Sequence, residues 1–550
     1  MKIVGSYLGF HDTGVALIEG GKIKAAYHEE RFRRKKSVYL GSQFPLMGLE
    51  ALQKDFGFKL FDKDVQFATA KPVFHISDQT KELLNNGLTI HTYDHQYCHA
   101  CNAYYTSGFP NERTLVFTYD GGDGGSDAFT HLDKDNQHRY LQFKYDSSFS
   151  SAWIVKNDRL IEIDKRFVGG SIANIWYGAC TMYGFQWLKD EGKIMGLAPQ
   201  GKFNQEIYDQ LQFFVEQNAI QAFCSYGDHI MDDVPEKEKE QFKKDFAFTL
   251  QMFTEEWLLK HISYLYETHG PFDNLALSGG IFANVKLNQR INEYLKFKNI
   301  WVCPAMGDDG LSVGSAIAHA LKVDTFTNRP LTNVFLGKKY SSSHIHTEFD
   351  NFEEKYNRPL HYERLDVKKA ASLLQQGKVI GVYDGEAEWG PRALGHRSIL
   401  VEPTRAETHR VINERLNRND IMPFAPIIME EHVQNILYYF KSKHTSEFMT
   451  LCYTVRPNWV DKIPAVIQRD DNTCRPQVVN RDRQPLFHYI LSEFNALTDI
   501  PVLMNTSFNV HGEPIINDID HALLHLTNNV VDYLIVGAGD GDGRYWLCHV

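Results

Sequence analysis

A strand-turn-strand-turn-strand pattern near the N-terminus occurs a second time further along the chain, and this repeat is the strongest constraint on the fold. The first copy predicts strands at residues 2–8, 14–18 and 22–27, with turns at His11-Asp12 and Glu19-Gly20-Gly21. The second copy predicts strands at residues 114–119, 126–132 and 139–143, with turns at 121–125 and 133–136. Short alternating apolar runs bounded by Gly and Asp are typical of an antiparallel meander. Its recurrence indicates an internal duplication.

In both copies a polar turn containing Asp and Gly follows an apolar strand, which leaves backbone N–H groups free to face an anion. The pattern resembles the duplicated fold of the actin, sugar-kinase and Hsp70 (ASKHA) ATPases, in which two such hairpins face each other across a nucleotide. On this resemblance we assign Asp120, Gly121 and Gly122 to nucleotide binding. Glycine-rich hairpins are also common without a ligand, so this assignment depends on the motifs described below.

Charge and composition argue against several classes of protein. The chain has 550 residues, 43% of them hydrophobic, and a formal net charge of -11, so we expect a folded protein with two or more domains. An acidic chain repels a phosphate backbone, which argues against nucleic acid as a partner. No apolar run is long enough to cross a bilayer, and eight cysteines without disulfide spacing fit a reducing cytoplasm. We therefore expect a soluble, cytoplasmic protein, and leave open whether it forms a homo-oligomer.

The remaining patterns divide the chain into two α/β parts. An apolar helical stretch ending at His99 separates the two meanders, and the basic run at 31–36 is interpreted as a solvated loop. The periodicity is interrupted between Asp324 and Ser343, so we predict domains at 1–330 and 331–550. Other predicted helices lie at 172–265, 282–295, 367–376 and 519–527, and other predicted strands at 274–278, 378–383, 501–504 and 533–536.

Two histidines four residues apart, in His95-Gln-Tyr-Cys-His99, indicate a candidate metal site. On a helix this spacing puts both imidazoles on one face, where they can chelate one ion. Asp120, after a predicted strand, and Asp308, in a Gly-Asp-Asp-Gly turn, can complete the set. Such a mixed shell suits Fe(II), Mn(II) or Zn(II) better than Ca(II). The alternatives are ordinary helix histidines and a C-x-x-C site starting at Cys98, which lacks a second paired ligand set.

Further motifs make the chain resemble the superfamily of TsaD, HypF and the O-carbamoyltransferases. In the first half they are Gly9-Phe-His-Asp-Thr-Gly14, Tyr119-Asp-Gly-Gly-Asp-Gly124, Glu191-Gly-Lys-Ile-Met-Gly-Leu-Ala-Pro199, Leu277-Ser-Gly-Gly-Ile-Phe-Ala-Asn284 and Gly307-Asp-Asp-Gly-Leu-Ser-Val-Gly314. A similarity to the YrdC-like C-terminal domain of the NodU/CmcH carbamoyltransferases rests on Trp389-Gly-Pro-Arg-Ala-Leu-Gly-His-Arg-Ser-Ile-Leu400, Pro423-Phe-Ala-Pro426 and Asn505-Thr-Ser-Phe-Asn509.

This resemblance implies a TsaD-like ATPase-fold domain, a YrdC-like α/β domain, and ATP-dependent transfer of a carbamoyl group from carbamoyl phosphate to a small-molecule hydroxyl. By analogy, carbamate released in the second domain attacks the α-phosphate of ATP, giving carbamoyl-adenylate and pyrophosphate, and the acceptor then displaces AMP. The divalent metal, with Fe(II) preferred over Mn(II) or Zn(II), neutralises phosphate charge. The acceptor is expected among secondary metabolites such as antibiotics, sugars or oligosaccharides, and the sequence does not choose between them.

The resemblance also implies a binding site for the carbamoyl phosphate donor. Arginine offers bidentate hydrogen bonds to phosphate, and hydroxyl and amide groups add further ones. The predicted donor-binding residues are Arg392, Arg397, Ser398, Arg415, Arg418, Asn505, Thr506 and Ser507. Two cationic positions common in relatives are lost at Leu416 and Met422, and Arg415 is expected to compensate for one of them. Arg475 and Gln477 follow the family pattern.

The first domain is expected to hold the reacting groups. His11, on the first hairpin turn, is the predicted general base for the acceptor hydroxyl, although a turn histidine without a role is the alternative. Asp12 and Lys193 complete the predicted catalytic set. The nucleotide-binding set adds Glu191, Gly279, Gly280, Asn284 and Asp308 to the hairpin residues, because glycines at a strand-to-helix junction let phosphates approach a helix N-terminus. Alternatively, Lys193 and Glu191 pair with each other.

Three other functions compete with this interpretation. A tRNA threonylcarbamoyl transferase shares the first-domain fold, but the acidic balance of the chain argues against tRNA. HypF-like hydrogenase maturation is disfavoured because its acylphosphatase segment and paired zinc-finger motifs are not found in the sequence. A catalytically silent ATP-binding module is favoured only by the two lost cations at Leu416 and Met422.

Overall fold

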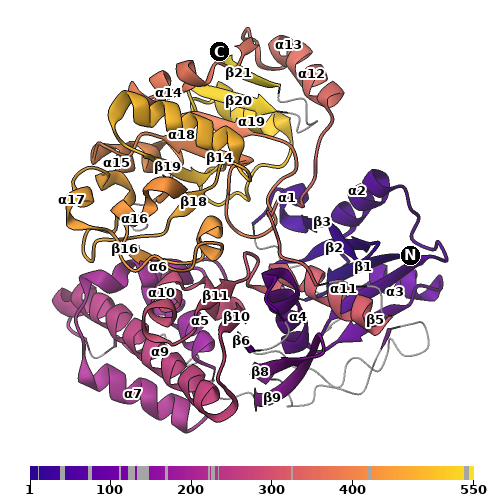
Figure 1. Cartoon of the computed structure of the whole chain (residues 1–550), viewed down its shortest axis with the longest axis vertical. Coiled ribbons are helices and arrows are strands. Elements are labelled where there is room, and N and C mark those ends of the chain that lie inside the picture. Colours follow the sequence, from indigo (N-terminus) through magenta and orange to yellow (C-terminus); the bar gives the residue numbers. More distant parts are fainter. Residues whose placement is uncertain are drawn as a thin grey trace. The chain divides into compact units, whose positions relative to one another are not determined.

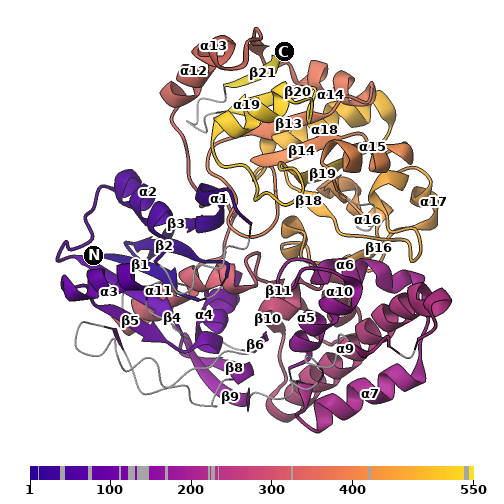
Figure 2. The same ribbon diagram turned by 180° about the vertical axis from the view of Figure 1, so that it is seen from behind.

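The computed structural model describes residues 1–9, 11–36, 44–71, 77–110, 113–121, 131–132, 148–167, 171–220, 223, 229–232, 234–323, 326, 328–418, 423–537 and 544–550. These residues form a mixed α/β protein that divides into two units (Figures 1 and 2). Unit 1 comprises Met1–Glu29 and Ser37–Leu331, and unit 2 comprises Glu30–Lys36 and Thr332–Val550. The division after Leu331 lies beside the predicted boundary, whereas the short segment 30–36 is a part of unit 2 that the sequence did not predict.

Unit 1 contains two sheets with the same topology. The first has the strand order β3-β2-β1-β4-β5-β7, and its β1 is antiparallel to β2 and parallel to β4. The second has the order β9-β8-β6-β10-β11, and its β6 is antiparallel to β8 and parallel to β10. The predicted duplication is therefore confirmed. The strands are β1 (Lys2–Tyr7), β2 (Gly14–Glu19), β3 (Lys22–His28), β4 (Val65–Ala70), β5 (Ile90–Tyr93), β6 (Thr114–Tyr119), β7 (His131–Leu132), β8 (Ser148–Lys156), β9 (Arg159–Phe167), β10 (Asn274–Ser278) and β11 (Asn299–Val302).

The second meander uses different strands from those predicted. Strand β6 pairs with β8, which pairs in turn with β9. His131–Leu132, the end of the predicted strand 126–132, pairs instead with β5 in the first sheet, and residues 126–130 and 139–143 lie outside the described residues. The true hairpin turns at Asn157-Asp158, where both residues have positive φ (50° and 58°). A two-residue loop of this kind matches the twist of the flanking strands, and Asn and Asp tolerate that backbone conformation.

Two helices of unit 1 pack against each other and against the two sheets. Helix α11 (Leu311–Lys322) packs on β1, β2 and β4, and α4 (His95–Ser107) packs on β6, β8 and β10. Gly314 permits the contact between the helices, because a Cβ there would lie 2.2 Å from the carbonyl oxygen of Cys98. The sequence predicted a helix ending at His99, but α4 begins at His95, since the Asp94 side chain accepts a hydrogen bond from Tyr97 N and caps the helix.

The helical region predicted at 172–265 is confirmed, and its helices lie in unit 1. None of the described helices is both long enough and apolar enough to span a membrane. The remaining helices of this unit, 3-10 turns included, are α2 (Leu46–Phe56), α3 (Asp78–Asn85), α5 (Ile172–Tyr183), α6 (Glu191–Leu197), η2 (Ala198–Gln200), α7 (Gln205–Glu216), η4 (Glu236–Glu238), α9 (Lys239–His269), η5 (Gly280–Ala283), α10 (Val285–Tyr294) and η6 (Asp308–Gly310).

Unit 2 is built on one mixed sheet with the strand order β12-β21-β20-β13-β14-β19-β15-β18, and buried apolar clusters pack against it. The strands are β12 (His361–Arg364), β13 (Ile380–Tyr383), β14 (Arg397–Val401), β15 (Ala425–Met429), β18 (Gln477–Val479), β19 (Val502–Ser507), β20 (Tyr533–Gly537) and β21 (Tyr545–His549), with β16 (Tyr453–Thr454) and β17 (Thr473–Cys474) forming a separate pair. The predicted alternation of strands and helices is confirmed, and the YrdC-like relationship stays a prediction.

The helices of unit 2 include both of those predicted from the sequence, α14 and α19. They are α12 (Ser342–Asp350), α13 (Phe352–Tyr356), α14 (Val367–Gln375), α15 (Glu407–Arg415), η7 (Glu430–His432), α16 (Val433–Ile436), η8 (Thr445–Phe448), α17 (Pro457–Val460), η9 (Pro464–Val466), α18 (Pro485–Thr498) and α19 (Ile519–Thr527).

The basic run at 31–36 is not the solvated loop that the sequence suggested. It begins in α1 (Glu29–Arg33), and the side chain of Arg31 is buried, with 3% of its surface exposed. Arg34 donates hydrogen bonds to the carbonyl oxygens of Ile515 (2.8 Å) and Pro514 (3.0 Å). Guanidinium groups that donate to backbone carbonyls explain why this short segment belongs to unit 2.

Candidate functional site

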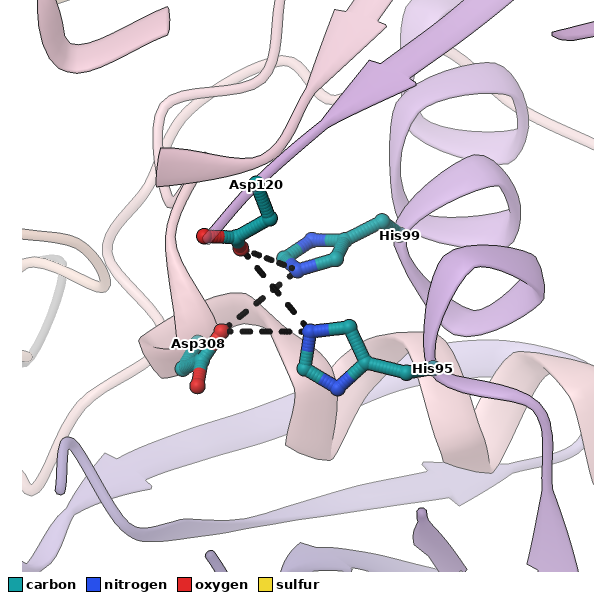
Figure 3. A group of neighbouring side chains, drawn as sticks. All are labelled: His95, His99, Asp120 and Asp308. Carbon is teal, nitrogen blue, oxygen red and sulfur yellow. Dashed lines mark ion pairs between the residues drawn. The ribbon is translucent and has the colours of Figure 1, made fainter. Parts of the chain in front are cut away.

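Four side chains from three parts of unit 1 converge on one point (Figure 3). His95 and His99 lie in the first turns of α4, Asp120 follows β6, and Asp308 begins the turn η6 before α11. One potential ligand atom from each residue lies within 4.8 Å of all the others. The four residues predicted to share a metal ion are therefore brought together by the fold.

The imidazole Nε2 atoms face the two carboxylates. Nε2 of His99 lies 3.1 Å from Oδ2 of Asp120 and 3.5 Å from Oδ1 of Asp308. Nε2 of His95 lies 3.8 Å and 3.5 Å from the same two atoms. The His99 side chain is fully buried, whereas the Asp120 side chain keeps 19% of its surface exposed. Of the four side chains, that of Asp120 is therefore the most exposed to solvent, and that of His99 is fully enclosed.

Hydrogen bonds behind the imidazoles fix which nitrogen carries the proton. Nδ1 of His95 lies 2.9 Å from the carbonyl oxygen of Lys71, which can only accept, so this nitrogen is protonated. Ser278 Oγ donates to the carbonyl oxygen of Met306 (3.1 Å) and therefore accepts from Nδ1 of His99 (3.1 Å). Both neutral rings then direct an Nε2 lone pair at the carboxylates, which is the arrangement of metal-binding histidines.

The electrostatics of the cluster favour a positive charge between its members. Burial would lower the pKa of His99, but the carboxylates of Asp120 and Asp308 outweigh this effect and raise it. Burial would raise the pKa of both carboxyl groups, but the histidines hold them below their usual range. Nε2 of His99 and Oδ2 of Asp120 are buried and make no hydrogen bond with good geometry to the described residues. Two nitrogens and two carboxylates with unused lone pairs fit a divalent transition metal.

The predicted general base adjoins this cluster. His11 lies on the turn between β1 and β2, with Nε2 3.8 Å from Oδ2 of Asp308 and Nδ1 2.9 Å from Oδ2 of Asp12. Asp12 has a positive φ of 52°, which a short polar side chain tolerates better than most. With 23% of its side-chain surface exposed, His11 can contact a substrate.

The glycines after β10 bring that strand end close to Asp120. Gly279 has a φ of 112°, and a Cβ there would lie 2.1 Å from the carbonyl oxygen of Tyr119. A Cβ on Gly280 would lie 3.1 Å from Oδ1 of Asp120. Only glycine meets both requirements at position 279, so this turn is built for close backbone approach.

Of the two hairpin glycines predicted to bind a nucleotide, Gly121 and Gly122, the structure describes only Gly121. Gly121 N donates a 2.6 Å hydrogen bond to Oδ1 of Asp120, whereas Oδ2 of Asp120 faces the two histidines. Gly122 lies outside the described residues. The amide of Gly121 is therefore occupied by Asp120, and its predicted contact with a nucleotide stays untested.

Three other predicted residues of unit 1 have partners within the protein. Asn284 caps α10 with its side-chain oxygen, and Glu191 accepts a 2.5 Å hydrogen bond from Leu188 N. Burial raises the pKa of Glu191. Lys193 forms a 2.8 Å ion pair with Asp190 rather than the alternative pair with Glu191. Binding of a nucleotide by these three side chains would require exchange of these partners.

In unit 2, Arg418 is the strongest candidate for holding an anion. Its NH1 donates to Oγ1 of Thr506 (2.8 Å), and its NH2 donates to Oγ of Ser507 (3.1 Å) and to the carbonyl oxygen of Asn509 (2.9 Å). Burial lowers the pKa of Arg418 to about 10, and no carboxylate among the described residues forms an ion pair with it. Burial also lowers the pKa of Arg475. A desolvated cation without a counter-charge favours binding of an anion.

Arg397 has a structural role that the sequence did not predict. The residue is fully buried, and its guanidinium lies 3.8 Å from the centre of the Tyr383 ring. Its NH1 donates to the carbonyl oxygen of Asp384, and its NH2 donates to that of Gly385 (3.1 Å). These donors bind backbone carbonyls, so Arg397 supports the turn after β13, and its predicted contact with the carbamoyl donor stays a prediction.

Ser398 and Asn505 also support the backbone. Ser398 Oγ accepts a hydrogen bond from Gly395 N (3.0 Å), and Asn505 Nδ2 donates to the carbonyl oxygen of Ala393 (3.1 Å). Both bonds hold the segment that carries Arg392, whose side chain is half-buried. Among the predicted arginines, Arg418 is the one whose lack of an ion pair with the described residues supports anion binding, and the role of Arg392 stays a prediction.

The compensation expected from Arg415 is not supported, because this residue forms a 3.1 Å ion pair with Asp532. Leu416 is buried in the apolar core of unit 2, so an apolar residue at this position serves packing. Met422 lies outside the described residues.

Comparison with known proteins identifies the family. Residues 47–317 match the profile described as "Carbamoyltransferase N-terminus", and residues 371–539 match "Carbamoyltransferase C-terminus". An uncharacterised protein of Methanocaldococcus jannaschii is 30% identical, over 84% of this chain and 75% of its own length. The chain belongs to the carbamoyltransferase family.

The carbamoyltransferase is also similar to Nodulation protein NolNO of Sinorhizobium fredii, at 26% identity over 96% of this chain and 78% of that protein. Among solved structures, full-length HypF in its phosphate- and nucleotide-bound form aligns with a TM-score of 0.23 and 14% identity, over 38% of this chain and 31% of HypF. At this TM-score the likeness carries no functional conclusion.

Sequence patterns missed several residues that shape the site of this carbamoyltransferase. Ser278 orients His99, and Asn509 contacts Arg418 through its carbonyl oxygen and its side-chain Oδ1. A serine that ends an otherwise apolar strand was the available signal for Ser278. The Lys71 carbonyl had no sequence signal, because every residue has a backbone carbonyl oxygen whatever its side chain.

Proposed function

We propose that this carbamoyltransferase moves a carbamoyl group from carbamoyl phosphate to a hydroxyl group of a small molecule, with ATP as co-substrate and carbamoyl-adenylate as intermediate. The observation that carries this proposal is the convergence of His95, His99, Asp120 and Asp308 beside His11. Family membership supports the group transferred, and the cluster supports a site where phosphate charge is neutralised.

The four-residue cluster would hold a divalent metal, with Fe(II) preferred and Mn(II) or Zn(II) as alternatives. When bound, the metal neutralises phosphate charge and orients the phosphates. We expect the ATP phosphates to bind near the turn at Gly279 and Gly280, which lies beside Asp120. Ser278 and the Lys71 carbonyl keep both imidazoles in the ligating tautomer.

His11 serves as the general base in the second half-reaction. Its Nε2 takes the proton of the acceptor hydroxyl while the oxygen attacks the carbamoyl carbon of carbamoyl-adenylate, and AMP leaves with the electrons of the broken carbon–oxygen bond. Asp12, hydrogen-bonded to Nδ1, favours the tautomer in which Nδ1 carries the ring proton and Nε2 carries the lone pair that accepts the proton of the hydroxyl. The imidazolium formed is stabilised by the same carboxylate and by Asp308.

Unit 2 supplies the carbamoyl donor in this scheme. Arg418 and Arg392 bind the phosphate of carbamoyl phosphate, with hydroxyl groups of Thr506 and Ser507 beside them. Water cleaves the donor to carbamate and inorganic phosphate, and carbamate then attacks the α-phosphate of ATP and displaces pyrophosphate. In this scheme unit 2 is a YrdC-like domain that binds the carbamoyl donor.

The test incubates the protein with ATP, carbamoyl phosphate and Fe(II) or Mn(II), without an acceptor, and measures AMP, pyrophosphate and carbamoyl-adenylate by mass spectrometry. We expect pyrophosphate that depends on carbamoyl phosphate, and its loss in Asp308→Asn. The matched control is Asp273→Asn, which removes a carboxylate of the same unit that pairs with Arg113 and Lys298. Pyrophosphate release that is independent of carbamoyl phosphate, or equal in both variants, would contradict the proposal.

A further inference from the structure

Residues 388–397, which end at the first residue of β14, are wrapped around one buried carboxylate. Oε1 of Glu388 accepts hydrogen bonds from the backbone N–H groups of Leu394 (2.8 Å), His396 (2.9 Å) and Arg397 (3.1 Å). The Glu388 side chain is fully buried. We call residues 388–397 the arginine loop, because Arg392 lies at its centre.

Arg31, from the basic segment of unit 2, binds carbonyl groups at the start of the arginine loop. Its NH1 donates to the carbonyl oxygen of Glu388 and its NH2 to that of Gly390 (2.9 Å). Asn505 and Gln477 donate to the carbonyls of Ala393 and Leu394, at 3.1 Å and 2.8 Å. Side chains thus satisfy backbone groups that would be paired within a sheet or helix in a regular segment.

The charges make this arrangement specific to one loop conformation. A buried carboxylate is costly unless it is paired and hydrogen-bonded. Burial would raise the pKa of Glu388, but the charges of His396, Arg31 and Arg397 and the N–H groups of the loop hold it below its usual value. Three N–H groups converge on one oxygen only when the loop curls around it, so any other loop conformation leaves the charge unsatisfied.

We propose that Glu388 and Arg31 are positioning residues that lock the arginine loop and so present Arg392 to the phosphate of the carbamoyl donor. The inference rests on the proposed function, because it assigns Arg392 to carbamoyl phosphate. It also gives the basic segment a role in the interior of unit 2, in place of the solvated loop that the sequence suggested.

The first test compares two variants of the same short segment. Arg31→Ala removes two hydrogen bonds to the arginine loop, whereas Arg34→Ala removes bonds to the carbonyls of Pro514 and Ile515 and leaves the loop untouched. In the ATP- and Mn(II)-dependent assay we expect Arg31→Ala to raise the KM for carbamoyl phosphate about tenfold or more, with kcat and the KM for ATP within about twofold. Arg34→Ala should leave all three near wild type, and Arg31→Lys should restore part of the affinity.

The second test measures the loop directly by hydrogen exchange in Glu388→Gln, which keeps the side-chain shape and removes the charge. We expect faster exchange of the amides of Leu394, His396 and Arg397, together with a raised KM for carbamoyl phosphate. Calorimetric binding of carbamoyl phosphate separates the two levels of the proposal. Wild-type protein that does not bind this compound overturns the proposed function and this inference with it. Wild-type binding with equal affinity in Arg31→Ala and Arg34→Ala, or unchanged exchange in Glu388→Gln, overturns the inference alone.

Discussion

Removal of the Ser278 hydroxyl should weaken metal binding while leaving the fold intact. The hydroxyl accepts a hydrogen bond from Nδ1 of His99 and donates to the carbonyl oxygen of Met306, both at 3.1 Å. In Ser278→Ala the metal-free protein can move the ring proton from Nδ1 to Nε2, where Oδ2 of Asp120 lies 3.1 Å away. The metal-bound protein cannot make this change, because the ion needs the Nε2 lone pair.

The cost therefore falls on the metal-bound state. Nδ1–H of His99, a residue with no exposed surface, would be left without an acceptor, and a buried unsatisfied donor costs about 1–3 kcal/mol. Since about 1.4 kcal/mol corresponds to a factor of ten in affinity, we expect the dissociation constant to rise by roughly 5- to 150-fold. Loss of second-layer partners of metal-bound histidines has effects of this size, about 10- to 100-fold.

The assay is calorimetric titration of metal-free protein with Mn(II) at constant pH. Ser315→Ala is the matched control, because Ser315 is equally buried in unit 1 and its hydroxyl donates to the carbonyl of Ser6 at 3.1 Å, away from the cluster. The control should bind Mn(II) like the wild type. Equal affinity in Ser278→Ala and Ser315→Ala would refute the tautomer argument, and loss of the thermal unfolding transition in Ser278→Ala alone would show a packing role instead.

Three further predictions concern His11, Arg418 and His319. His11→Asn should lower kcat for transfer to an acceptor by about a hundredfold or more, while carbamoyl-adenylate still forms without acceptor. Mass spectrometry measures both products. An equal loss of both steps would contradict the role of His11 as general base. Arg418→Lys loses the forked donors and should raise the KM for carbamoyl phosphate by about tenfold to a hundredfold, without changing Mn(II) affinity, whereas Arg415→Lys should change neither. Burial lowers the pKa of His319 from 6.5 to about 4. The buried neutral ring therefore contributes its full stability above pH 6.5, and this contribution is lost as the pH falls toward 4. Urea unfolding at pH 7 and pH 5 should therefore show a smaller pH dependence in His319→Gln, and an unchanged dependence would count against this assignment.

Local patterns were sufficient to predict the four residues of the His–Asp cluster. The four-residue spacing of His95 and His99 places both rings on one helical face whatever surrounds the helix. Asp120 follows a strand and Asp308 begins a turn. Aspartate is common at such positions, because its side chain can form hydrogen bonds with nearby backbone groups. Each of these properties depends on a few neighbouring residues, and it can therefore be read without knowledge of the fold.

The partners of these residues could not be predicted in this way. The pairing of β6 with β8 rather than with residues 126–132 depends on which distant strand completes the sheet. Likewise, Arg397 carries the same sequence signal as Arg392, but burial directs its donors to backbone carbonyls. Sequence similarity alone could not distinguish an arginine that would bind a substrate from an arginine that supports the backbone.

The sequence by itself determined that a meander occurs twice, the helical spacing of the two histidines and, through its motifs, the family, because these signals lie within short stretches of the chain. Only the tertiary structure decided that the donors of Arg397 bind backbone carbonyls, how Ser278 orients His99, and that Arg31 is buried beside Glu388. Those outcomes depend on contacts between residues far apart in the chain, where burial and hydrogen-bond competition select one partner among many.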